Sequence, residues 1–201
     1  MSVATIEAPA VNTTVEVPSD ALRQLANVAL FADSTRGATL GVVRLECDGV
    51  KITAVATNRY VLGVETILLN APAEPFTVSL DVAALRPALK LTTNGYSAPL
   101  RITVGLGSVV FDNGEGLARV TTSPPDFPKW ERLFPNGDTS DHEPLPVTFG
   151  VAPKLLAILA KVTVEIKNAP IHLTVHTPLK PCVAEIGDTF RALVMPVRLS
   201  A

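Results

Sequence analysis

The chain has 201 residues, of which 47% are hydrophobic and 18% are charged. This length fits one large domain or two small ones, and this composition is sufficient for a hydrophobic core. The formal net charge of −2 does not indicate a nucleic-acid-binding protein, so any contact with nucleic acid has to rest on local charge. Cys47 and Cys182 are too few for a disulfide framework or a metal cage, and we expect free thiols. No segment resembles a signal peptide or a membrane span, so we expect a cytoplasmic protein that does not bind membranes.

A repeating pattern follows the flexible tail that we expect at 1–12. The first unit begins with a short strand at 13–18 and a helix at 20–32, whose apolar residues recur at helical spacing. Ser19 or Asp20 is positioned to cap this helix. Three strands are then predicted at 39–48, 50–58 and 60–68.

The pattern returns twice. The second unit has a strand at 76–81, a helix capped by Asp81 and shortened or kinked by Pro87, and strands at 100–105, 108–114 and 117–123. The third unit has a strand at 145–150, a helix with Pro153 in its first turn, and strands at 164–168, 171–176, 181–187 and 191–199. Between these two units, 120–144 is rich in Pro, Asp and Gly and is predicted to be a linker. The fold class is therefore α+β, with three β-α-β-β-β units and helices on one side of antiparallel sheets.

Five segments of these units, in their order and spacing, resemble the bacterial DNA sliding clamp, the beta subunit of DNA polymerase III. They are KITAVATNRYVLGVETI (51–67), FTVSLDVAALRPALKL (76–91), PPDFPKWERLFP (124–135), PLPVTFGVAPKLLAIL (144–159) and VMPVRL (194–199). The resemblance covers 13–199. It implies a complete clamp domain at 13–135, similar to the family's middle domain, and a half-domain at 136–201, similar to its C-terminal end. The unit that would begin the last domain is absent, which departs from the family's pattern.

The resemblance implies a function as a sliding clamp, a bacterial or phage processivity factor that oligomerises around duplex DNA without sequence preference. Such a protein is an accessory subunit of a DNA polymerase, not an enzyme, and needs no cofactor. Its expected partners are a DNA polymerase, other proteins with clamp-binding motifs, a clamp loader and further copies of itself. Because the number of units is odd, neighbouring chains in such a ring would be flipped. The alternative is a clamp-like module that does not close and captures clamp-binding peptides as a competitor or adaptor.

Basic side chains outnumber acidic ones on the three predicted helices, where the acidic residues lie mainly at the helix starts. Positive charge that faces phosphate gives affinity without sequence information. The predicted DNA-binding residues are Arg23, Arg86, Lys90, Lys154 and Lys161. The alternative for each of them is an ordinary solvated helix surface.

The resemblance also implies a hydrophobic groove for partner peptides. The matching positions are Leu40, Thr57, Tyr60, Leu62, Pro128, Arg132, Leu133, Val183, Val194, Met195, Pro196, Val197, Arg198 and Leu199. Most are apolar, as a groove for Leu or Phe anchors requires. The alternative is strand core, especially for Leu62 and Val194. Four positions depart from the family's pattern, so we expect an altered motif preference: Arg59 replaces Gly, Tyr60 replaces His, Val61 replaces Arg and Pro153 replaces an aromatic residue.

Catalytic and metal-binding patterns are not found. His172 and His176 lie on one face of a predicted strand but have no third ligand nearby in the sequence. The glycines of GLGSVVFDNGEG fall in predicted hairpin turns with no helix after them, which argues against a phosphate-binding loop. No Ser-His-Asp or Cys-His arrangement has a motif context.

Overall fold

The structure is a computed structural model that describes residues 12–37, 39–91, 98–123, 126–134, 149–175, 177 and 180–197. Its elements in chain order are β1 (Thr13–Val17), α1 (Ala21–Ala29), the 3-10 helix η1 (Ser34–Arg36), β2 (Val42–Cys47), β3 (Lys51–Thr57), β4 (Val61–Leu68), β5 (Phe76–Asp81), α2 (Val82–Leu89), β6 (Leu100–Gly105), β7 (Ser108–Asp112), β8 (Leu117–Ser123), the 3-10 helix η2 (Glu131–Leu133), α3 (Pro153–Leu159), β9 (Ile171–Thr174), β10 (Cys182–Ile186) and β11 (Phe190–Val194). None of the helices in these ranges is long and apolar enough to cross a bilayer.

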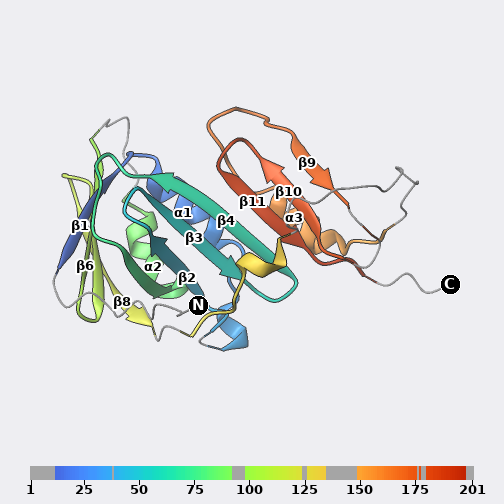
Figure 1. Cartoon of the computed structure of the whole chain (residues 1–201), viewed down its shortest axis with the longest axis horizontal. Helices are drawn as coiled ribbons and strands as arrows, with labels where there is room; N and C mark the ends of the chain where they lie inside the picture. The colour runs from blue at the N-terminus through green and yellow to red at the C-terminus, as the bar shows by residue number, and fades with distance from the viewer. Residues whose placement is uncertain are drawn as a thin grey trace, which may run out of the picture.

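The strands form one 11-stranded antiparallel sheet in the order β1-β6-β7-β8-β5-β2-β3-β4-β11-β10-β9. In Figure 1 the three helices lie behind the strands, and the yellow segment that contains η2 crosses in front of them. One cluster of buried side chains joins α1, α2 and α3 to the same side of the sheet. The prediction of an α+β fold with helices on one side of an antiparallel sheet is therefore confirmed.

The first two units exchange their first strands. β1 of the first unit pairs with β6 of the second, and β5 of the second unit pairs with β2 of the first. The third unit joins the first through β4 and β11, where Leu62 lies opposite Leu193. Through this pairing the strands of all three units belong to one sheet, and its two end strands are β1 and β9.

The two predicted helix caps have different outcomes. The Asp81 carboxylate accepts hydrogen bonds from the Ala83 and Ala84 N–H groups at 2.8 and 3.0 Å, so its cap is confirmed. Asp20 stands at the N-cap of α1, but its carboxylate instead binds the Arg23 side chain at 2.6 Å and caps no backbone N–H group. The prediction that the Asp20 side chain caps α1 is therefore wrong. The carboxylate binds the nearby guanidinium, which is a charged and stronger donor than a backbone N–H group.

The strand predicted at 164–168 is also wrong. These residues form bends and turns, Asn168 has a positive φ of 61°, and the Ala169 N–H donates to the Ile166 carbonyl. The alternating Val164 and Ile166 suggested a strand, but the segment closes on itself. Of the strand predicted at 145–150, only the end lies within the described residues, where Gly150 forms an isolated bridge with Val197.

Candidate functional site

The surface that α1, α2 and α3 form on their side of the sheet is called the helix face below. Arg86 and Lys90 are four residues apart on α2 and its C-cap, so they share one side of that helix. Lys154 lies in the first turn of α3, and Lys161 follows its last turn. All four side chains are exposed, and none forms an ion pair with another described residue. They are therefore available to bind an anion.

Arg23, the fifth predicted DNA-binding residue, is already engaged. Its guanidinium donates to the Asp20 carboxylate and to the Thr163 carbonyl, both at 2.6 Å. The neighbouring Asn27 donates to the same carbonyl at 2.6 Å and accepts from the Thr163 N–H at 3.0 Å. The structure therefore connects Arg23 to the segment after α3, where it joins the first unit to the third.

A buried carboxyl lies beneath this junction. Glu65 on β4 has no exposed surface, and its oxygens accept no hydrogen bond of good geometry from another described residue. Burial raises the pKa of Glu65, while the Thr189 and Asn27 side chains and the Arg23 charge oppose that shift and Asp20 adds to it. Sequence analysis missed this group, because Glu65 and Thr66 are adjacent in an otherwise apolar strand and the pattern does not show which of them lies on the covered face.

The opposite side of the sheet is called the connector face, after residues 126–134, which cross it. Its buried cluster is Val55, Leu62, Val64, Val183 and Leu193, and the aromatic side chains that pack on it are Phe127, Trp130 and Phe134. The rings of Trp130 and Phe134 meet edge to face with centroids 6.1 Å apart. The connector is thus bound to the sheet by its aromatic residues.

Two arginines hold the ends of this aromatic segment. The Arg44 guanidinium lies 5.7 Å from the centre of the Phe127 ring, and that of Arg191 lies 4.7 Å from the centre of the Phe134 ring. These are cation–π contacts, one from β2 and one from β11. Sequence analysis included the aromatic residues in the segment 124–135 but did not select them, or Arg44 and Arg191, as site residues. Their one signal was the concentration of three aromatic residues in 127–134 in a chain that is only 5% aromatic.

The tip of the β3–β4 hairpin meets the segment after β11. The Asn58 carboxamide oxygen accepts from the Tyr60 and Val61 N–H groups at 3.0 Å each, which shapes the turn. The Tyr60 carbonyl then accepts from the Met195 N–H at 2.9 Å, and the Val197 N–H donates to the Gly150 carbonyl at 2.8 Å. Residues 195–197 are therefore held in place between this hairpin and the start of the third unit.

The structure brings together many of the predicted peptide-binding residues. Leu62 and Val183 lie under the connector, which itself carries the exposed Pro128, Arg132 and Leu133. Tyr60, Met195 and Val197 are 47%, 38% and 44% exposed, and Pro196 is half-buried between the last two. Most of the predicted set thus belongs to the connector face and the hairpin tip beside it.

Other members of the set lie elsewhere. Val194 is buried in the core on the helix side, and Leu40 is buried before β2, with its carbonyl accepting from the Asp33 N–H. The Thr57 hydroxyl donates to the Val61 carbonyl at 2.8 Å, so it supports the hairpin. Arg198 and Leu199 lie outside the described residues.

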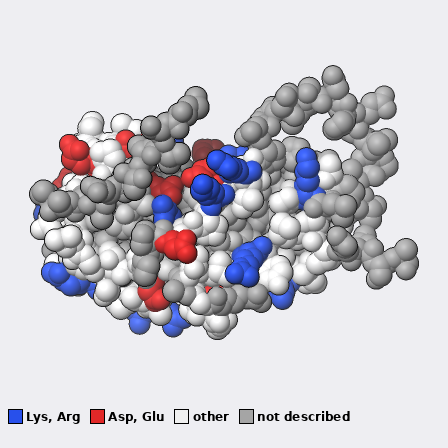
Figure 2. Space-filling view, turned by 60° about the horizontal axis from the view of Figure 1, so that its bottom comes forward, with Lys and Arg blue, Asp and Glu red and all other residues white. Residues whose placement is uncertain are grey.

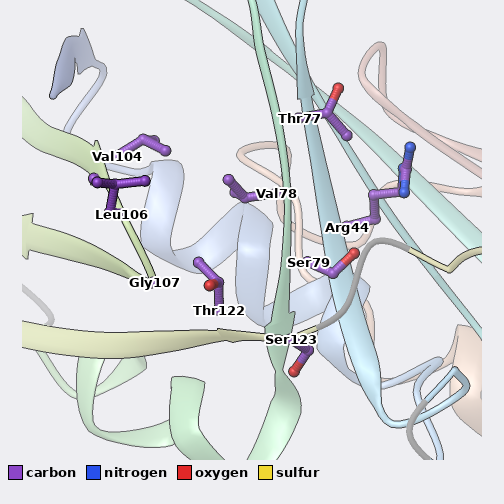
Figure 3. A pocket seen from close by; sticks show the side chains of 10 residues that line it. Arg44, Thr77, Val78, Ser79, Val104, Leu106, Gly107, Thr122 and Ser123 are labelled. Carbon is purple, nitrogen blue, oxygen red and sulfur yellow. The ribbon is translucent and has the colours of Figure 1, made fainter. Parts of the chain in front are cut away.

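A cavity of about 190 Å³ opens where β5 and β8 separate after only two residue pairs. Its labelled lining residues are Arg44, Thr77, Val78, Ser79, Val104, Leu106, Gly107, Thr122 and Ser123 (Figure 3). The Ser79 hydroxyl is buried and has no hydrogen-bond partner among the described residues.

Figure 2 shows that basic and acidic side chains lie next to one another in the middle of the surface that it presents, in keeping with the small net charge.

Comparison with known proteins supports the fold. No protein-family model and no curated protein sequence matches this chain. Solved structures do match: a DNA polymerase III beta chain from Streptococcus pneumoniae has a TM-score of 0.77 at 16% identity, with 99% of this chain and 67% of that one covered. A DNA polymerase sliding clamp from Pseudomonas aeruginosa has a TM-score of 0.77 at 14% identity, with 99% and 69% covered. A DNA polymerase III beta subunit from Thermotoga maritima has a TM-score of 0.75 at 14% identity, with 100% and 68% covered. The chain has the fold of a DNA sliding clamp.

Proposed function

We propose that this chain is a clamp-type processivity factor that oligomerises around duplex DNA and binds partner peptides on its connector face. In this proposal 13–135 is a complete clamp domain and 136–201 is half of one, so further copies are needed to close a ring. The observation that carries the proposal is the clamp fold itself, whose helices carry exposed Arg86, Lys90 and Lys154. The setting is bacterial or phage DNA replication in the cytoplasm, with a DNA polymerase and a clamp loader as partners.

The DNA part of the proposal rests on charge placement. The three α-helices have no acidic residue in their first turns, and Asp20 and Asp81 stand only at the N-caps of α1 and α2. Affinity for phosphate from such side chains is independent of sequence and depends on salt. Lys161 adds a further exposed cation beyond α3, whereas Arg23 contributes less because its guanidinium already donates to Asp20 and to Thr163.

The DNA test is a salt titration of duplex binding. The double variant Arg86→Glu/Lys90→Glu should bind every duplex sequence more weakly, and the slope of log affinity against log salt should fall by about one for each lost phosphate contact. Lys51→Glu/Arg101→Glu is the matched control, with the same charge change on strands. Equal stimulation of a cognate polymerase by the double variant and the parent protein would rule out this interface.

The peptide part rests on the tail and the hairpin. Tyr60 and Met195 are joined by a backbone hydrogen bond and remain partly exposed beside the buried Leu62. Partly exposed apolar side chains beside a backbone held by hydrogen bonds are suited to a short hydrophobic motif. Isothermal titration with a polymerase-type clamp-binding peptide should show binding that is lost when 195–201 are removed. Leu68→Ala, which truncates a residue that is 65% exposed at the far end of β4, should keep full affinity. Equal affinity of the truncated and full-length proteins would contradict this assignment.

The second candidate, a module that captures peptides without encircling DNA, is favoured by one observation. The buried cluster of the connector face is formed by β3, β4, β10 and β11, the connector of the same chain covers it, and the segment after β11 lies beside it at the hairpin tip. Peptide binding would therefore not require an oligomer. A protein that binds the peptide as a monomer and shows no salt-dependent duplex binding would favour this candidate over the ring.

A further inference from the structure

Three hairpins of the described chain are closed by the same kind of turn. In each, one Asp or Asn side chain accepts from the backbone N–H groups two and three residues ahead: Asp48 between β2 and β3, Asn58 between β3 and β4, and Asn113 between β7 and β8. In each, the N–H of that residue also donates to the carbonyl three residues ahead, at 3.2 Å. The three turns can therefore be compared position by position.

The residue after the Asp or Asn has a positive φ in all three turns. It is Gly49 with a φ of 104° in the first and Gly114 with a φ of 84° in the third, but Arg59 with a φ of 75° in the β3–β4 hairpin. This conformation disfavours any residue with a Cβ atom, and the two glycines show which residue suits the turn. A strained residue where glycine would serve the fold better points to a function of its side chain.

The position of Arg59 in the molecule indicates what that function is. Arg59 is adjacent to Tyr60, whose carbonyl accepts from the Met195 N–H at 2.9 Å. Tyr60, Met195 and Val197 are the partly exposed residues of the peptide site proposed above. The Arg59 side chain is exposed, and its guanidinium forms no ion pair with another described residue. The hairpin thus presents a cation at the border of an apolar surface.

The charges around this border all have one sign. Three segments meet at this end of the sheet, namely 57–61, 149–154 and 194–197, and they are joined by the Tyr60–Met195 hydrogen bond and the Gly150–Val197 bridge. Arg59 and Lys154 are their charged residues, and none of their residues is acidic. A guanidinium at the rim of an apolar site favours a partner with a carboxylate, which it can bind through two parallel hydrogen bonds.

We propose that Arg59 makes this site selective for partner segments in which an Asp or Glu lies next to the hydrophobic anchors. The inference rests on the proposed function, because it assigns the partner chemistry of the same peptide site. The apolar side chains bind the anchors, and the Arg59 guanidinium pairs with the neighbouring carboxylate. Because this pair is exposed to solvent and screened by salt, it determines which peptide is preferred and supplies only a small part of the affinity.

The test compares peptides that share one hydrophobic clamp-binding motif and carry Glu, Gln or Lys at each position that flanks the anchors. At low salt, the best Glu peptide should bind the full chain about three to five times more tightly than its Gln counterpart, and the Lys peptide should bind most weakly. The preference should decrease in about 0.5 M salt. Arg59→Gln keeps the backbone strain but removes the charge, so it should bind the Glu and Gln peptides equally. The matched control is Arg119→Gln on β8, four strands away from β4 in the sheet, and it should keep the preference.

Equal affinity of the parent protein for Glu and Gln peptides at every flanking position would overturn the proposal, as would a preference that persists in Arg59→Gln. If circular dichroism shows that Arg59→Gln does not fold, Arg59→Gly decides by the same loss of preference, since the other two turns contain glycine at this position. Binding of all the peptides without a preference would leave the peptide part of the proposed function intact and refute only the role of Arg59. Absence of binding by every peptide would refute both.

Discussion

On the helix face, one cluster of buried side chains extends from β1 to β11 and includes residues of all three α-helices. On the connector face, a smaller cluster of five buried side chains lies under a short segment without regular strands. The two faces belong to one sheet but are covered in different ways. A face covered by helices gains stability from burial over a wide area, whereas three half-buried aromatic side chains cover a smaller area and contribute less.

This difference in burial predicts that substitutions on the two sides of the sheet have different effects on stability. Each fully buried apolar side chain contributes about 1.5–3 kcal/mol, and the largest of them, including Phe31, Phe76, Phe111 and Phe190, all lie on the helix side. The connector aromatics are only half-buried. Truncation of a fully buried side chain on the helix side should therefore lower stability most, whereas truncation of a half-buried aromatic side chain on the connector face should cost less stability and reduce peptide binding.

The largest effect is expected from Phe31→Ala. Phe31 has no exposed surface and packs on Phe190 with ring centroids 5.5 Å apart, across the junction of the first and third units. Its ring also fills the space above Gly63, where an added Cβ would lie only 2.7 Å from it. The free energy of unfolding should fall by about 3–5 kcal/mol. Urea unfolding measures this free energy. The control is Leu30→Ala, because Leu30 is 37% exposed and its truncation should lower the free energy of unfolding much less. Equal losses would contradict the view that the helix face holds the fold.

Trp130→Ala should have a smaller effect on folding and a larger one on binding. Trp130 is half-buried between Phe134 and the sheet, so its removal should lower the free energy of unfolding by about 1–2 kcal/mol, less than for a buried aromatic residue. Because it anchors the connector, affinity for a clamp-motif peptide should also fall. The control is Leu133→Ala in the same segment. Leu133 is 51% exposed, so its truncation should change the free energy of unfolding by less than about 0.5 kcal/mol. Unchanged peptide affinity in Trp130→Ala would mean that the connector does not contribute to peptide binding.

Glu65→Gln tests the buried carboxyl on the helix side of the sheet. Burial raises the pKa of Glu65 in the folded state above its ordinary value of 4.5, so the folded protein holds this proton at a higher pH than the unfolded chain does. The folded state binds more protons in that interval, and stability therefore falls as the pH rises from about 4.5 through the raised pKa. The Gln variant lacks this loss and should be more stable than the parent by roughly 1 kcal/mol at neutral pH.

The measurement for Glu65 is the difference in urea midpoint between parent and variant at a series of pH values. Subtraction removes the background of other carboxylates, such as Asp48, whose pKa backbone hydrogen bonds lower. The two proteins should be close to each other near pH 4 and separate at higher pH. A constant difference across the series would mean that Glu65 ionises as it does in the unfolded chain.

The sequence predicted the elements of the fold well where the hydrophobic period and turn chemistry agree. Asp81 before an apolar helix and the glycines between β6 and β7 are local signals, and local signals suffice for a cap or a hairpin. The segment 164–168 failed because its geometry is imposed from a distance, by α1 side chains that bind the neighbouring Thr163. Period-two alternation of Val164 and Ile166 contains no information about that contact.

The candidate sites were less predictable than the fold, for a related reason. Val194 and Leu193 are adjacent in an apolar strand, and only the register with β4 sends the first to the helix side and the second to the connector face. In the same way, nothing local to Arg23 shows that its guanidinium also donates to the Thr163 carbonyl, 140 residues further along the chain. Side-chain direction in a sheet covered on both faces is a property of tertiary pairing.

The smallest effect is expected from Arg59→Gly at the hairpin tip, where the two faces meet. Arg59 has a positive φ of 75°, a conformation that disfavours residues with a Cβ atom. Gly114 has the equivalent place in the β7–β8 hairpin with a φ of 84°, and Asn113 there binds the turn as Asn58 does here. The Arg59 side chain is exposed, so its removal loses little packing. Relief of strain should exceed the added freedom of the unfolded chain and raise the free energy of unfolding by about 0.5–1 kcal/mol. The matched Gly114→Ala variant should lose a similar amount, since it introduces the same strain into the second hairpin. A loss of stability in Arg59→Gly would mean that the arginine side chain makes a stabilising contact that outweighs its backbone strain.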